Sequence, residues 1–141
     1  KLQQRVKDEH IDNVIFKGFV EKKYIPYILS RSSVNVLNYS QSNYNWSRGN
    51  SSNKLFEYMA SGKPIISTVK MGYCILDKYQ CGLSLEECTP QALAEQILKI
   101  HDMPAETYAQ MAHNAQEGAK DFDFSVLTER LYHVIESVEQ K

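Results

Sequence analysis

The sequence is poor in the features that mark several common classes of protein. Its 141 residues carry a formal net charge of −1, so no basic field of the kind that binds nucleic acid is present. No run approaches the roughly 20 consecutive apolar residues that a membrane-spanning helix needs. The sequence contains neither G-x-G-x-x-G nor a glycine-rich loop with a Walker A lysine. These absences disfavour a nucleic-acid-binding protein and a membrane-spanning helix. They also mean that any nucleotide would be bound without the two commonest nucleotide-binding motifs.

Cysteine and histidine are too few and too dispersed to predict a metal site. Cys74, Cys81 and Cys88 include no Cys-x-x-Cys pair, which fits reduced thiols and a cytoplasmic protein. The four histidines are scattered along the chain at positions 10, 101, 113 and 133. We therefore expect no bound metal and a cytoplasmic location, with the inner face of the membrane as the alternative.

What the sequence does contain is an alternation of apolar strands and amphipathic helices. Strands are predicted over residues 13–20, 34–38, 65–68 and 82–85, each a short apolar or β-branched run. Helices are predicted before, between and after them. This order predicts one α/β domain over residues 1–141, a Rossmann-like parallel sheet of about four strands flanked by helices.

The second half is marked by helix start and stop signals. Thr89 followed by a proline predicts one helix start, Pro104 a second and Ser125 a third. Gly118 is the predicted end of the second of these helices. The first ten residues resemble the last turns of a helix, so we expect a preceding part of the domain that this chain lacks.

Three segments are expected at the ligand-binding edge of the sheet, one of them the turn after Thr68 that contains Gly72. Ligands of doubly wound sheets lie beyond the carboxyl ends of the strands. Gly18, Phe19 and Val20 end the first predicted strand there. A loop without periodicity over residues 39–52, with Trp46 and Arg48, follows the second. Irregular loops of this length are usually functional or disordered.

The stretch GNSSNKLFEYMASGKPIIST over residues 49–68 follows that loop and is the candidate site. Leu55, Phe56, Met59 and Ala60 fall on one helix face, and Asn53, Lys54 and Glu57 share the other. The start of such a helix can hold an anion through unpaired N–H groups and the helix dipole. Lys54 opposes that dipole, so it either binds a diphosphate or extends to solvent or towards Glu57. Glu57 either accepts from ribose hydroxyls or is a solvated helix charge.

The segment NKLFEYMASGKPII over residues 53–66 resembles the signature helix of glycosyltransferase family 4, which has the GT-B fold and typically shows E-A-M-A-x-G-x-P-V-I. The resemblance extends to VIFKGFV, IPYIL and SVNVL at residues 14–20, 25–29 and 33–37, and to PQALA at 90–94. It covers nearly the whole chain and implies the C-terminal, donor-binding domain of a two-domain enzyme, without the N-terminal, acceptor-binding domain.

The resemblance also implies roles for particular residues. Glu57 would bind the ribose, and the backbone of Gly18, Phe19 and Val20 would lie against the base. The helix start at Ser52, Asn53, Lys54 and Leu55 would receive the diphosphate, and Lys54 and Glu57 would be the catalytic pair. The family pattern is Glu-x(7)-Glu, but Gly49 stands eight residues before Glu57, so the contact to the donor sugar is unassigned.

The resulting hypothesis is retaining, metal-independent glycosyl transfer from a UDP- or GDP-sugar. It involves no cofactor besides this donor. The acceptor implied by analogy is a polysaccharide or a lipid-linked glycan, with peripheral membrane association of the full-length enzyme, and the fragment alone is expected to be inactive. Two alternatives stay open: a nucleotide-sugar epimerase domain of the same fold, and a non-catalytic α/β binding module.

Overall fold

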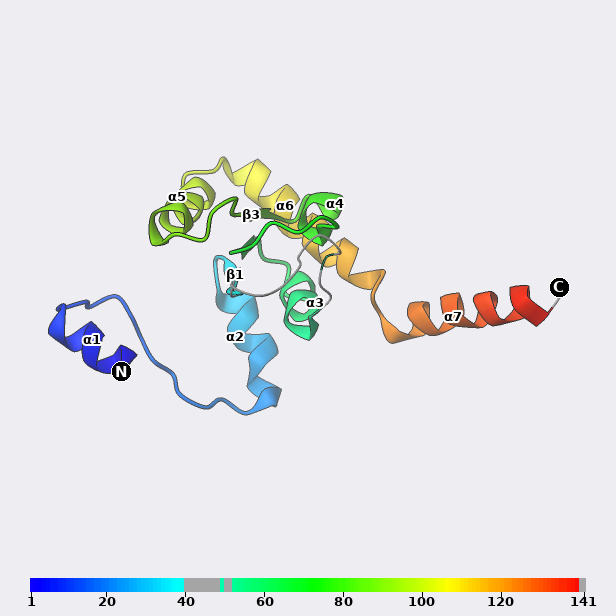
Figure 1. Cartoon of the computed structure of the whole chain (residues 1–141), viewed down its shortest axis with the longest axis horizontal. Coiled ribbons are helices and arrows are strands. Elements are labelled where there is room, and N and C mark those ends of the chain that lie inside the picture. Colours follow the sequence, from blue (N-terminus) through cyan, green and yellow to red (C-terminus); the bar gives the residue numbers. More distant parts are fainter. Residues whose placement is uncertain (40–48, 50–51, 140–141) are drawn as a thin grey trace.

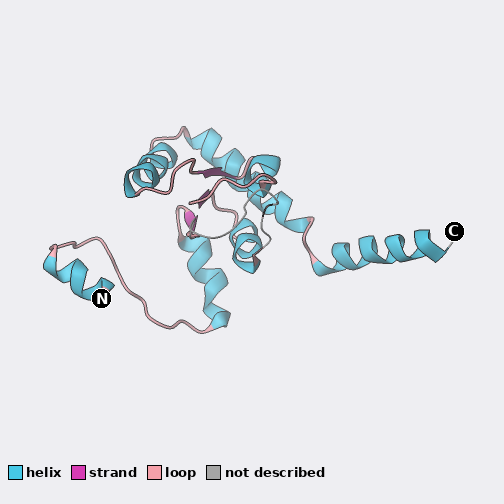
Figure 2. Cartoon of the chain, in the orientation of Figure 1, coloured by secondary structure: helices cyan, strands magenta, loops and turns pink. Residues whose placement is uncertain are grey.

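A computed structural model describes residues 1–39, 49 and 52–139 of the chain. Its helices are α1 (Leu2–Asp8), the short 3-10 helix η1 (Lys22–Tyr24), α2 (Ile25–Arg31), α3 (Asn53–Ala60), α4 (Ile75–Tyr79), α5 (Pro90–His101), α6 (Ala105–Lys120) and α7 (Phe124–Glu139). Its strands are β1 (Asn35–Leu37), β2 (Ile65–Ser67) and β3 (Gly82–Ser84). Helices surround these strands in the middle of the molecule, and the N- and C-terminal helices extend from it in opposite directions (Figures 1 and 2).

The three strands form a parallel sheet in the order β1-β2-β3, which confirms the predicted α/β class. Asn35 is in register with Ile65, and Ile65 with Gly82. All three residues of β2 are buried, as expected of the central strand of a covered parallel sheet. A Cβ on Gly82 would lie 2.1 Å from the carbonyl oxygen of Ile65, so glycine is required for this approach of β3 to β2.

The strand predicted over residues 13–20 is wrong, so the described sheet has three strands and not four. This segment has no regular secondary structure and runs from α1 to η1 at a distance from the sheet (Figure 1). Its apolar side chains are exposed, Ile15 to 74% and Phe19 to 93%. An apolar run becomes a strand only where a neighbouring strand pairs with its N–H and C=O groups, and among the described residues none does.

The core lies between the sheet, α3 and α6. Met59 of α3 is completely buried, and so is Ala115 of α6. A Cβ on Gly118 would lie 2.6 Å from the ring of Tyr79, whose hydroxyl donates to Asp121 at 2.6 Å. The predicted stop at Gly118 is therefore wrong: α6 continues to Lys120, and the glycine serves close packing instead.

The starts of the last helices follow local capping chemistry. The Thr89 hydroxyl accepts from the N–H of Ala92 at 3.1 Å, which confirms the predicted cap of α5. Ser125 is not the cap of α7. Instead the carboxylate of Asp123 accepts from the N–H of Ser125 at 2.9 Å and so supplies the acceptor at that helix end.

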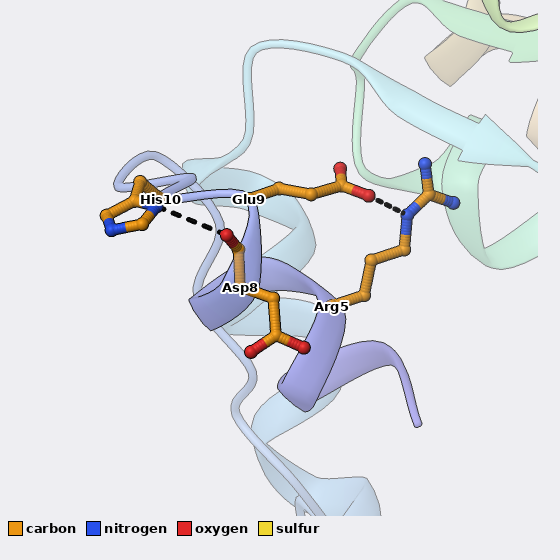
Figure 3. A network of polar contacts seen from close by, with 4 residues as sticks. All are labelled: Arg5, Asp8, Glu9 and His10. Atoms are coloured by element: carbon orange, nitrogen blue, oxygen red, sulfur yellow. Dashed lines mark hydrogen bonds and ion pairs between the residues drawn. The ribbon is translucent and has the colours of Figure 1, made fainter.

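Two peripheral helices make few contacts with this core. At the end of α1, Arg5 pairs with Glu9 at 2.6 Å, and the His10 ring lies 3.2 Å from the carbonyl oxygen of Asp8 (Figure 3). These contacts are exposed and stay within the same short segment. Helix α7 projects away from the sheet (Figure 1) and exposes apolar side chains along its length, at positions 124, 127, 131, 134, 135 and 138. No described helix is long and apolar enough to span a membrane.

The cysteines provide a test of this packing. Cys81 is fully buried at the entry to β3, and burial raises the pKa of its thiol to about 12, whereas Cys88 is exposed. Because the thiolate is the reactive form, we expect a disulfide reagent at about pH 8 to modify Cys88 quickly and Cys81 only after unfolding. Because Cys74 is half-buried, the test uses a Cys74→Ser background, in which Cys88→Ser should abolish the fast phase and Cys81→Ser should leave it unchanged. Equal reaction rates at both thiols in the native protein would contradict this fold.

Candidate functional site

The start of α3 lies at the carboxyl edge of the sheet, where β1 and β2 end. The N–H of Tyr39 donates to the Thr68 hydroxyl at 2.8 Å, and the N–H of Thr68 donates to the carbonyl oxygen of Leu37 at 3.0 Å. A hollow of about 430 Å³ opens beside these contacts. It is lined by Val36, Leu37, Asn38, Tyr39, Ser52, Asn53, Lys54 and Tyr58. The structure thus brings the predicted helix start together with the end of β1.

Ser52 is the residue before the first turn of α3. Its backbone is extended, with φ −71° and ψ 144°, and its carbonyl oxygen accepts from the N–H of Leu55 at 2.9 Å. Its hydroxyl makes no capping bond to the helix and lies 2.7 Å from the hydroxyl of Tyr39. Helix geometry leaves the first N–H groups without partners inside the helix, so this end can bind an anion.

The side chains of α3 divide as the spacing predicts except at one position. Leu55 and Met59 are buried in the core, whereas Asn53, Lys54 and Glu57 are exposed. Ala60, which was expected on the apolar face, is exposed and lines a hollow together with Glu57. The Leu55 side chain packs in the core and its N–H is bonded to the carbonyl oxygen of Ser52, so Leu55 fixes the helix beneath the site.

Glu57 faces a different hollow from Lys54. That hollow, of about 450 Å³, lies between α2 and α3 and is lined by Lys22, Ile25, Pro26, Leu29, Ser30, Glu57, Ala60, Ser61 and Gln116. Lys54 and Glu57, both in the described part of the chain, make no ion pair with each other. The Lys54–Glu57 ion pair, which would have explained both residues as ordinary surface charges, is therefore not formed. Lys22 is a lining cation that the sequence did not point to.

The predicted segment Gly18 to Val20 lies at the surface, with Gly18 and Phe19 exposed and Val20 half-buried. Gly18 has φ +67°, and a Cβ there would meet nothing within 4 Å. These residues line neither of the two hollows beside α3, and they lead directly into η1, which carries Lys22. The chain therefore runs from this segment to Lys22, which lines the same hollow as Glu57.

Gly49, which stands where the family pattern has glutamate, is held in a conformation that excludes a side chain. Its φ is +78°, and a Cβ would lie 2.6 Å from the carbonyl oxygen of Tyr73. Both observations require glycine, so the missing carboxylate reflects a different local packing at this position. Trp46 and Arg48 of the same loop lie outside the described residues.

In the part of the chain that the structure describes, few ionisable groups lie near the first turn of α3. The pKa of Tyr58 is raised, chiefly because the phenol is half-buried and also because Glu57 and Tyr39 lie near it. Within residues 1–39, 49 and 52–139, no three histidine, cysteine, aspartate or glutamate side chains gather in a way that could hold a metal ion. Among the described residues, Lys54 is the cationic side chain that lines the hollow at the helix start.

The fold and this edge define a parallel α/β domain of the Rossmann-like class, with its candidate site at a helix start. The sequence profile of the family described as "Glycosyl transferases group 1" matches residues 1–118. The chain belongs to this family. No protein in a search of curated sequences matches it.

Solved structures support the same fold. Sucrose-phosphate synthase from Thermosynechococcus elongatus is similar over 97% of this chain and 34% of its own, with a TM-score of 0.69 and 21% identity. Anabaena HepE, solved in complex with UDP-glucose, is similar over 96% of this chain and 36% of its own, with a TM-score of 0.62 and 21% identity. The chain therefore spans about a third of the length of these proteins, and at this identity the likeness shows the fold alone.

The packing of Gly49 can be tested against Gly62. Both have positive φ, but a Cβ on Gly62 would meet its nearest atoms at 3.8 Å. Alanine at either position should lower the free energy of unfolding by about 1–2 kcal/mol, because its Cβ disfavours the left-handed conformation. Gly49→Ala should lower it by a further 1–3 kcal/mol or so, because the Tyr73 backbone must shift. Urea unfolding measures this difference, and equal losses would show that Gly49 is not packed as described.

Proposed function

We propose that this chain is the donor-binding half of a retaining glycosyltransferase of family 4, with the GT-B fold. The observation that carries the proposal is the family match over residues 1–118, which includes α3 at the carboxyl edge of the sheet. Members of a group 1 glycosyltransferase family need a place for an activated sugar, and the start of α3 offers the N–H groups and the cation that suit its diphosphate.

The proposed roles follow the two hollows beside α3. Asn53 and Lys54 receive the diphosphate at the helix start, where the exposed ammonium adds to the positive end of the helix dipole. Glu57 accepts hydrogen bonds from the ribose in the neighbouring hollow, which Lys22 also lines. The backbone of Gly18 to Val20, which leads into η1, lies against the base.

The proposed chemistry is electrostatic. As the bond between the sugar and the diphosphate breaks, negative charge grows on the leaving nucleoside diphosphate. Donors that are already oriented stabilise that charge without reorganising during the reaction. In this proposal Lys54 and the first turn of α3 supply the stabilisation, so the site needs no metal or further cofactor.

UDP-sugars are the first donors to test, because HepE was solved with UDP-glucose. GDP-sugars are the second. We propose a polysaccharide or lipid-linked glycan as acceptor, bound by another part of the full-length enzyme, which would act in the cytoplasm or at the inner face of the membrane.

Nucleotide binding by point variants tests the donor site. We expect Lys54→Ala and Glu57→Ala each to raise the Kd for UDP at least about fivefold, because each removes a charged hydrogen-bond partner. Lys99→Ala and Glu95→Ala, which remove exposed charges from α5, should leave the Kd unchanged. Isothermal titration calorimetry with UDP and GDP provides the measurement.

The opposite results are equally clear. A wild-type chain that binds neither UDP nor GDP would count against the donor site. So would Lys54→Ala and Glu57→Ala variants that bind as tightly as the α5 controls do.

A further inference from the structure

The hydroxyl of Ser52 does not cap the start of α3, although its position favours this. A serine with extended backbone before a helix ordinarily accepts a hydrogen bond from an N–H two or three residues further on. Ser52 has this backbone conformation, yet its side chain makes no such bond. Its Oγ lies 2.7 Å from the Oη of Tyr39 instead. The end of α3 is therefore left without its usual side-chain cap.

Tyr39 is itself fixed to the ends of two strands. Its N–H donates to the Thr68 Oγ1 at 2.8 Å, and Thr68 is 1% exposed. The N–H of Thr68 donates in turn to the carbonyl oxygen of Leu37. The tyrosine side chain packs against the hydrophobic core and reaches the same hollow that Asn53 and Lys54 line. The sheet thus holds the backbone of Tyr39, while its ring packs on the core that α3 shares and its hydroxyl reaches Ser52.

We propose that Tyr39 is a positioning residue for the donor site, which holds the Ser52 hydroxyl away from the N–H groups of α3 so that these remain available to the diphosphate. This inference rests on the proposed function, because it requires the diphosphate to lie at the first turn of α3. It adds a residue that the family pattern around α3 did not single out.

The hydrogen-bond chemistry of the pair explains how this works. A hydroxyl has one hydrogen to donate and two lone pairs that accept. Either hydroxyl can donate in this pair, and in the proposed arrangement the phenol, which is the better donor, donates to the Ser52 Oγ. The Ser52 hydrogen can then point at an anion. Without Tyr39, the Ser52 oxygen turns to accept from the helix and consumes one of the N–H groups that the diphosphate needs.

A double-mutant cycle separates this role from simple structural support. The variants are Tyr39→Phe, Ser52→Ala and the combination of the two, with Tyr108→Phe as a matched control. The Tyr108 hydroxyl also donates a hydrogen bond, to the carbonyl oxygen of Ser33 at 2.7 Å, but it contacts neither hollow beside α3. Calorimetry measures the affinity for UDP, and competition with UDP measures the affinity for uridine. Urea unfolding measures the stability of each variant.

The expected result is specific to the phosphates. Tyr39→Phe should raise the Kd for UDP about 3- to 10-fold, which is the effect of one hydrogen bond. The Kd for uridine should stay unchanged. In the Ser52→Ala background, Tyr39→Phe should have no further effect on UDP, because it acts through that serine. Tyr108→Phe should change neither affinity.

Other outcomes overturn the inference. An equal loss for UDP and uridine, a loss that adds to that of Ser52→Ala, or the same loss in Tyr108→Phe would show that Tyr39 is only a structural support. Wild-type affinity in Tyr39→Phe would refute the inference and leave the proposed function standing. A wild type that binds neither UDP nor GDP would refute both.

Discussion

The burial of one face of α3 is the constraint on which the candidate site depends. Leu55 and Met59 occupy the core between the sheet and α6, and burying two such side chains contributes several kcal/mol, of the order of 1.5–3 each. Because a helix cannot rotate without withdrawing that face, Asn53, Lys54 and Glu57 are held towards solvent. The close approach at Gly118 tightens the same contact from the side of α6. Packing therefore fixes the direction of the polar residues before any ligand arrives.

Local patterns predicted most of this fold, and non-local contacts account for the failures. Helical spacing over residues 53–60 predicted the two faces of α3 except at the exposed Ala60, and the β-branched run at 65–68 predicted the buried strand β2. The run at 13–20 has the same apolar character, but whether such a run forms a strand depends on a pairing partner that its own residues do not specify. Gly118 is a comparable case, since a stop signal was outweighed by packing against Tyr79.

The candidate site was predictable to a similar extent. The position of the helix start at the carboxyl edge followed from the order of strands and helices. Tyr39 was placed at this edge only as the first residue of the loop over 39–52, with no role of its own, and Lys22 was missed. That Lys54 and Glu57 line two separate hollows depends on what packs on either side of α3, which spacing along one helix does not reveal. The role of Gly49 likewise required the position of Tyr73.

The hydrogen bonds that join Leu37, Tyr39, Thr68 and Ser52 also bear on motion. They link the ends of β1 and β2 to the start of α3 through one backbone bond and side-chain contacts that are buried or half-buried. A hinge needs a few residues that can change their backbone angles without breaking such contacts. Backbone rotation at these positions would break the contacts, which disfavours a hinge there. In the proposed enzyme, closure around the donor would therefore bring other parts of the protein towards this edge.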